Sequence, residues 1–224
     1  MVIARIGLIA ALEEEADAFA PDQAGQVERL GEHDVRLVEI AGRMVAVNRC
    51  GVGKVNAASA ATLIHSRYNV DLLMIIGAAG RLSGIVGDCF VIRDAVQGDY
   101  GARRAGGFVH FTAGAWPIGP ADIAAICAHP LPDIGLPGAR IVTTDSFVEC
   151  VDFAAGLRDG LGGDLIDMET AALAQTAVRL SVPWAAIKAP SDDADAHSAG
   201  DFTANLRRAA RLAAEAAERA IAHL

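Results

Sequence analysis

Short apolar runs alternate with longer, alanine-rich segments along this chain. Runs with the length and composition of strands occupy residues 5–11, 71–76, 87–97, 139–144, 165–168 and 183–189, and residues 35–40 and 44–50 predict a hairpin. Helices are expected at residues 54–67, 169–180 and 201–224. Because strands alternate with helices and glycines stand at the junctions, the pattern predicts an α/β protein with a parallel or mixed sheet.

Composition adds the expectation of a large core. The chain has 224 residues, of which 53% are hydrophobic and 21% are charged. This balance excludes intrinsic disorder. Neither a low-complexity linker nor an internal repeat interrupts the sequence, so we expect residues 1–224 to form a single domain.

Charge and hydropathy argue against two classes of partner. Lys and Arg total 19 and Asp and Glu total 28, which gives a net charge of -9, and aromatic residues make up only 5%. Such a chain is not expected to bind nucleic acid. No stretch approaches the roughly 20 apolar residues of a membrane helix, and no lysine-rich segment precedes the apolar run at residues 6–12. We therefore expect a cytoplasmic protein without membrane contacts.

The cysteines, histidines and serines do not form a recognisable reactive motif. The four cysteines are widely spaced without a CxxC pair, so we expect reduced core thiols at Cys50, Cys89, Cys127 and Cys150. The six histidines show no HExxH or paired spacing, and no metal site is expected. The GxSxG pattern of esterases and a GxGxxG after the first strand are also missing, which disfavours esterase and redox chemistry.

Three acidic clusters follow predicted strands, where open α/β sheets bind their ligands. They are Glu13–Glu15, Asp167–Thr170 and Ser191–Asp193. A carboxylate in the second cluster can accept hydrogen bonds from a vicinal diol such as ribose, and a partly buried acid in the third can donate a proton. Each cluster also has a structural explanation, as a helix start, a helix cap or a turn. Their shared position after strands is the observation that favours a site.

Two glycine-rich stretches are further candidates. Gly51–Lys54 lacks the full GxxxxGK[ST] spacing, so a nucleoside triphosphate is not an expected ligand. Gly77–Gly80 follows the most apolar run of the chain. Its small residues either let the backbone approach a ligand closely or form a plain turn.

Six motifs together resemble one family, the bacterial 5'-methylthioadenosine/S-adenosylhomocysteine nucleosidases of the purine nucleoside phosphorylase superfamily. They read IGLIAALEEE (6–15), CGVGKV (50–55), GAAG (77–80), TDSFV (144–148), DMETAA (167–172) and APSD (189–192). They stand in the family's order and span nearly the whole chain. The resemblance implies a nucleoside phosphorylase-like fold, a three-layer α/β/α sandwich with a mixed central sheet, assembled as a homodimer.

The resemblance also implies hydrolysis of the N-glycosidic bond of a 5'-modified adenine nucleoside, a reaction of methionine salvage. Glu15 matches the carboxylate that activates the attacking water, and Asp192 matches the acid that protonates the leaving purine. Glu169 matches the residue that binds the ribose hydroxyls. No metal or redox cofactor is implied, because one acid and one water-activating carboxylate are the minimum for this cleavage.

The same resemblance implies the remaining substrate contacts. Phe147 matches an aromatic packed on adenine, Val148 reads the base edge through its backbone, and Phe202 closes the pocket. Further residues implied to line the site are Val52, Ala78, Gly80, Met168 and Ser191.

Three features depart from the family's pattern. Ala78 stands where relatives usually carry a serine that helps to hold the water, and Lys188 stands where they commonly carry arginine. Residues 97–120 do not align clearly and include Tyr100, Phe108, Phe111 and Trp116. We expect this segment either to border the 5' pocket of a partner subunit or to fold as a hairpin onto its own subunit.

Two other activities stay open as alternatives. A phosphate-dependent nucleoside phosphorylase needs a cationic anion site, whereas Leu73–Ile76 carries no cation and Glu15 repels a dianion, which favours hydrolysis. A catalytically silent nucleoside-binding protein has no need for both an acid and a water activator. The sequence leaves the preferred 5' substituent undetermined.

Overall fold

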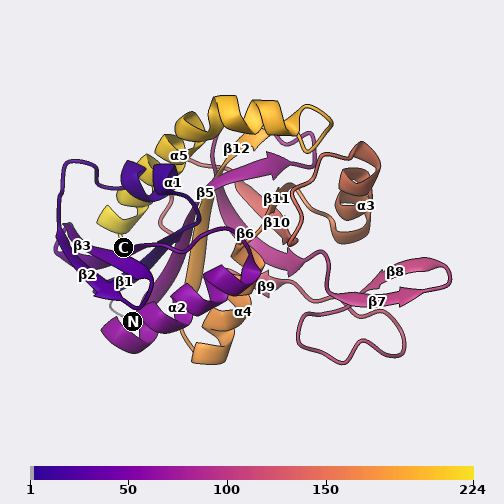
Figure 1. Cartoon of the computed structure of the whole chain (residues 1–224), viewed down its shortest axis with the longest axis horizontal. Helices are drawn as coiled ribbons and strands as arrows, with labels where there is room; N and C mark the ends of the chain where they lie inside the picture. The colour runs from indigo at the N-terminus through magenta and orange to yellow at the C-terminus, as the bar shows by residue number, and fades with distance from the viewer. Residues whose placement is uncertain (1–2) are drawn as a thin grey trace.

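The computed structural model describes residues 3–224. Its helices are α1 (Glu13–Ala18), α2 (Lys54–Tyr68), α3 (Val151–Leu161), α4 (Thr170–Leu180) and α5 (Ser198–Ala222). Its strands are β1 (Arg5–Ala10), β2 (Gln26–Leu30), β3 (His33–Ile40), β4 (Arg43–Arg49), β5 (Leu72–Arg81), β6 (Phe90–Gln97), β7 (Gly101–Arg104), β8 (Gly107–His110), β9 (Ile126–Cys127), β10 (Gly138–Thr143), β11 (Leu165–Asp167) and β12 (Trp184–Asp192). Figure 1 traces this order from the N-terminus to the C-terminus.

The central sheet is mixed, as the sequence predicts. Its strand order is β11-β10-β6-β12-β5-β1-β4-β3-β2, with β9 paired to β6. The central pairs β12–β5, β5–β1 and β1–β4 are parallel, whereas β12–β6 and β4–β3 are antiparallel. β11 also pairs with β5 in antiparallel fashion, so that β5, β12, β6, β10 and β11 close into a ring.

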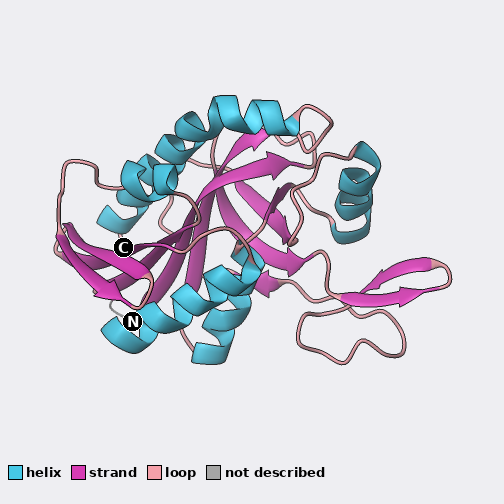
Figure 2. Cartoon of the chain, viewed as in Figure 1, coloured by secondary structure: helices cyan, strands magenta, loops and turns pink. Residues whose placement is uncertain are grey.

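Helices cover both faces of this sheet, which gives the expected three layers (Figures 1 and 2). On one face, α2 and α4 pack through small and branched residues such as Ala57, Ile64 and Leu173. On the other face, α5 presents alanines at helical spacing, from Ala209 to Ala220, against β5 and β12. Alanines let the long helix approach the sheet closely, because they add little volume beyond the backbone.

Two central strands run further than the sequence predicts. The apolar pattern predicts that β5 ends at Ile76 and that Pro190 ends β12, but both strands continue through the site. β5 continues because β12 and β11 supply partners for Gly77–Arg81. Past Lys188, β12 no longer pairs with β6, so no hydrogen bond to β6 is lost because Pro190 lacks an N–H. The pairing of β12 with β5 continues, with a register shift after Pro190.

Three elements were not predicted from the sequence, and residues 97–120, whose fold the sequence left open, contain a hairpin. β2 and β9 lack a clear apolar period in the sequence, whereas α3 places Ala154, Leu157 and Leu161 at helical spacing on a buried face and was overlooked. Residues 101–110 form the β7–β8 hairpin, which projects from the body of the molecule rather than folding onto it (Figure 1). Phe111, after the hairpin, is buried, whereas Trp116 is 78% exposed.

The expectation of four core thiols is correct for only two cysteines. Cys50 and Cys89 are buried, and Cys127 and Cys150 are exposed, all four as free cysteines. Burial raises the pKa of Cys50 to about 12 and the pKa of Cys89 to about 11. Cys127 lies in the short β9 and Cys150 directly precedes α3, and neither element was predicted from the sequence.

Candidate active site

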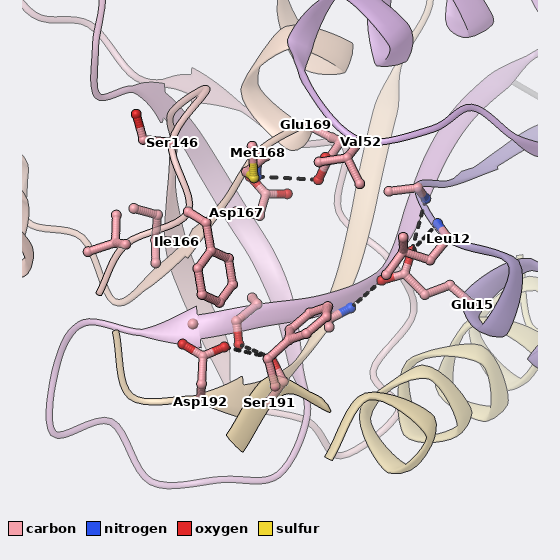
Figure 3. A pocket seen from close by; sticks show the side chains of 17 residues that line it. Leu12, Glu15, Val52, Ser146, Ile166, Asp167, Met168, Glu169, Ser191 and Asp192 are labelled. Carbon is pink, nitrogen blue, oxygen red and sulfur yellow. Dashed lines mark hydrogen bonds between the residues drawn. The ribbon is translucent and has the colours of Figure 1, made fainter. Parts of the chain in front are cut away.

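A cavity of about 300 Å³ lies where β5, β11 and β12 meet. Gly80 of β5 pairs with Ile166 of β11 on one side and with Asp192 of β12 on the other. This volume is at the lower end of the range for small-molecule sites. The structure brings together every residue that the sequence placed in the site, and Figure 3 shows the cavity from close by. These residues are Glu15, Val52, Ala78, Gly80, Phe147, Val148, Met168, Glu169, Ser191, Asp192 and Phe202.

Glu15 is held at one side of the cavity by backbone groups alone. Oε2 accepts hydrogen bonds from the amides of Ala11 and Leu12 at 2.9 and 3.0 Å, and Oε1 accepts one from Ala78 at 2.8 Å. Its side chain is buried, unlike its neighbour Glu13, which pairs with Arg49 at the surface. The cluster Glu13–Glu15 therefore begins α1, as expected of a helix start, and also contributes the Glu15 side chain to the cavity.

Gly77 makes the approach of Glu15 to β5 possible. A Cβ at this position would lie 2.2 Å from Oε1 and 2.5 Å from Cδ of Glu15. The residue also has a φ of +139°, which L-residues with a side chain rarely adopt. Gly77–Gly80 is therefore part of β5, and its small residues leave space for the Glu15 carboxylate. The alternative expectation, a plain turn, is wrong.

Glu169 lies on another wall, at the start of α4. Oε1 accepts a hydrogen bond from the amide of Gly53 at 2.8 Å, and Oε2 accepts one from Met168 at 3.3 Å. These contacts tie the loop before α2 to the loop after β11. Lys54 is the first residue of α2, so Gly51–Gly53 form the loop that leads into this helix.

A buried ion pair lies behind these carboxylates. Lys188 Nζ is 3.0 Å from Asp167 Oδ2, and both side chains are only 2% exposed. Asp167 also accepts hydrogen bonds from the hydroxyls of Thr143 and Thr170, at 2.6 and 2.5 Å, and from the Thr170 amide. The expectation of local capping by Asp167 is correct, but its partner Lys188 could not be found from sequence spacing.

Burial and this ion pair act in opposite directions on the site's carboxyl groups. Burial raises the pKa of Glu15, and the charge of Lys188 with three backbone N–H donors partly offsets it. Burial, followed by repulsion from Asp167, raises the pKa of Glu169 to about 7. Burial alone would lower the pKa of Lys188, but the surrounding carboxylates raise it above its usual value. The lysine is therefore charged and balances part of the negative charge.

Asp192 lies across the cavity from Glu15 (Figure 3). Oδ1 accepts a hydrogen bond from the amide of Ala194 at 3.1 Å, and Oδ2 lies 2.8 Å from the Ser191 hydroxyl. A hydroxyl can donate or accept, so this contact suits either protonation state of the acid. Asp193, the other acid of the cluster, is 71% exposed and pairs with Arg81.

Two aromatic rings close the apolar side of the cavity. Phe147 and Phe202 meet edge to face, with centroids 5.7 Å apart and an interplanar angle of 78°. Phe147 is 44% exposed, whereas Val148 beside it is buried. The structure adds lining residues that the sequence analysis did not place in the site: Ala11, Leu12, Ala79, Ser146, Ile166 and Asp167. All but Ile166 lie within the six motifs, and Ala79 and Asp167 belong to stretches that the sequence names as candidates, but the sequence assigns no individual role to them.

We predict that Gly77→Ala strongly destabilises the protein. The added Cβ must displace the Glu15 side chain, and the alanine backbone must adopt a φ that is unfavourable for a residue with a side chain. We therefore expect the free energy of unfolding to fall by about 2–3 kcal/mol in urea denaturation. Gly84→Ala is the matched control, because no atom lies within 4 Å of the point that a Cβ would occupy there. Equal stability of the two variants would contradict the described packing.

We predict a pH-dependent stability contribution from Glu169. With its pKa raised from 4.5 to about 7, folded Glu169 retains a proton between these values that the unfolded chain releases. The free energy of unfolding therefore falls by on the order of 2 kcal/mol as the pH rises through this window. Above the window, Glu169 adds no further pH dependence. Urea denaturation at pH 5 and pH 7 measures this loss, which Glu169→Gln should abolish.

Glu32→Gln is the control for that comparison, since the Glu32 side chain is 97% exposed. It should retain the difference between the two pH values that the unchanged protein shows. A Glu169→Gln variant that loses as much stability between pH 5 and pH 7 as this control does would rule out the titration of Glu169.

The comparisons with known proteins agree with this architecture. A sequence model of the phosphorylase superfamily matches residues 5–222. The 5'-methylthioadenosine/S-adenosylhomocysteine nucleosidase of Staphylococcus aureus strain MRSA252 is 28% identical, over 98% of this chain and 100% of the relative. The nucleosidase of the same name from Neisseria meningitidis, solved with methylthio-immucillin-A, is 25% identical with a TM-score of 0.83, covering 99% of this chain and 100% of that one.

A third relative shares the fold but carries the name of a different activity. The futalosine hydrolase of Helicobacter pylori strain 26695 has a TM-score of 0.84 at 20% identity, covering 99% of each chain. The similarities extend over nearly the whole chain, and they confirm the resemblance that the six motifs indicate. By its sequence match and its fold, the chain belongs to the phosphorylase superfamily.

Proposed function

We propose that this chain hydrolyses the N-glycosidic bond of a 5'-modified adenine nucleoside, 5'-methylthioadenosine or S-adenosylhomocysteine, and releases adenine and the free ribose derivative. The relative from Staphylococcus aureus carries the name of this activity and matches over its full length. The single observation that carries the proposal is the pair of carboxyl groups at opposite sides of one cavity. The reaction would serve methionine salvage.

The two carboxyl groups are anchored at different points along β5. Glu15 is bonded to the amide of Ala78, and Asp192 lies beside Gly80, two residues further along β5. At the rise of a β-strand, these two anchoring points are about 7 Å apart. An acid at one of these points and a water-activating carboxylate at the other can act on opposite faces of a sugar held between them.

Each carboxyl group has a defined task in this reaction. Asp192 donates a proton to the five-membered ring of the purine as the bond between the base and C1' of the sugar breaks. Glu15 accepts a proton from the water that attacks C1', where oxocarbenium character develops. Glu169 accepts hydrogen bonds from the ribose hydroxyls, and its charge lies near the developing cation. Met168 packs against the sugar.

The composition of the cavity wall favours water over phosphate as the nucleophile. Among residues 3–224, the side chains that line the cavity include Glu15, Asp167, Glu169 and Asp192 but neither lysine nor arginine. Lys188 is nearby, but it is buried against Asp167. A phosphate dianion would thus meet negative charge without a free cation to bind it.

The base is held by a short segment that we call the adenine loop, residues 145–148. Phe147 packs on the purine, and the backbone of Val148 reads the edge of the base. Phe202, in edge-to-face contact with Phe147, closes the pocket from α5. Val52 and the backbone around Gly80 and Ser191 fill the remaining contact surface.

The oligomeric state and the location are further parts of the proposal. We propose that residues 1–224 act as one nucleosidase domain in a homodimer, with residues 97–120 bordering the 5' pocket of the partner. Exposed apolar side chains on this segment, among them Phe108, Trp116 and Ile118, support this role. Among residues 3–224, the structure contains no helix long and apolar enough to cross a membrane. The cytoplasmic location stays a prediction.

Adenine release, measured with and without phosphate, tests the proposed reaction. The unchanged protein should release adenine from 5'-methylthioadenosine at the same rate in both conditions. Glu15→Gln and Asp192→Asn should each reduce kcat by about 10²–10⁴-fold, because an amide neither takes up nor supplies the proton. Strict dependence on phosphate would identify a phosphorylase instead, and binding without turnover would identify a silent nucleoside-binding protein.

Replacement of exposed apolar residues tests the dimer. Trp116→Ser and Ile118→Ser together should shift the protein towards monomers in sedimentation experiments and raise KM, because the partner's 5' pocket loses its border. Phe111 is unsuitable for this test, since it is buried within its own subunit. A fully active monomer of the unchanged protein at assay concentration would contradict the proposed assembly.

A further inference from the structure

Lys54, the first residue of α2, lies outside the cavity lining but joins two segments that form its walls. Its ammonium is 2.6 Å from Asp99 Oδ1, 3.2 Å from Gln97 Oε1 and 3.7 Å from Asp145 Oδ2. Its side chain is 19% exposed, so most of it is removed from solvent. An ammonium with three acceptors from two separate segments of the chain is unlike an isolated surface ion pair.

The same cluster also bonds through the backbone. The amide of Lys54 donates to Asp145 Oδ1 at 2.9 Å, and the amide of Asp145 donates to Asp99 Oδ2 at 2.8 Å. Asp145 thus accepts from the free N–H at the start of α2, and Asp99 accepts from the loop after β10. Two aspartates this close would repel each other without the lysine between them.

This cluster is connected to both binding walls of the cavity. Gly53, directly before Lys54, donates its amide to Glu169 Oε1 at 2.8 Å. Asp145 opens the adenine loop and stands two residues before Phe147. The start of α2 therefore contacts the ribose-binding carboxylate through one amide and the adenine loop through the next.

We propose that Lys54 is a positioning residue that sets the adenine loop at its distance from Glu169 and thereby tightens binding of the base. The inference rests on the proposed function, since it takes the loop as the adenine contact. Lys54 touches neither the sugar nor the proton-transfer groups. Its loss therefore affects binding of the base more than the rate of bond cleavage.

Lys54→Met removes the charge and the donors and keeps much of the aliphatic stem. We expect the Kd for adenine, measured by calorimetry, and the KM for the nucleoside substrate to rise about tenfold, with kcat changed by less than about threefold. Lys54→Arg, which keeps the charge, should restore most of the affinity. Asp99→Asn weakens the same cluster from its other side and should change affinity in the same direction.

Arg67→Met is the matched control, because Arg67 stands near the other end of α2 and pairs with Glu28 at 3.1 Å. It should leave the Kd, KM and kcat unchanged. If Lys54→Met behaves like this control, or if Lys54→Met and Asp99→Asn lower kcat in proportion to a loss of thermal stability without a change in Kd, the positioning role is wrong. An unchanged protein that neither binds adenine nor cleaves the nucleoside would instead refute the proposed function.

Discussion

The buried pair of Lys188 and Asp167 is the interaction on which the site depends. It joins the strands β12 and β11, which lie on either side of the end of β5. Removal of one partner from a buried ion pair leaves an uncompensated charge, which destabilises proteins by about 3–5 kcal/mol. Here the consequence extends further, because burial raises the pKa of both Glu15 and Glu169 and the positive charge of Lys188 offsets part of that rise.

The closed ring of strands explains why the side chains of Glu15, Glu169 and Asp192 reach the same cavity. An open parallel sheet would leave β11 and β12 at separate positions, but the additional pairing of β11 with β5 brings both strands against Gly80. Small residues at Gly77–Gly80 then leave room for carboxyl groups on both sides of β5. Asp192, Glu15 and Glu169 therefore owe their positions to backbone pairing more than to contacts with one another.

The sequence predicted the parts of the fold that depend on local patterns. The apolar period located β1, β3–β6, β10–β12, α2, α4 and α5, and the order of strands and carboxylates located the cavity wall. It missed the length of β5 and β12, because a glycine stretch and a proline signal strand ends unless tertiary partners continue the pairing. It also missed the Lys188–Asp167 pair and the exposure of Cys127 and Cys150, which depend on contacts between distant segments.

The substitution of alanine at position 78 is understandable in these terms. Glu15 takes its hydrogen bond from the backbone amide of Ala78, so the anchor of this carboxylate does not require a side-chain hydroxyl. The other two donors to Glu15 are also backbone amides. A site held in this way tolerates side-chain changes wherever the residue stays small enough for the backbone to approach.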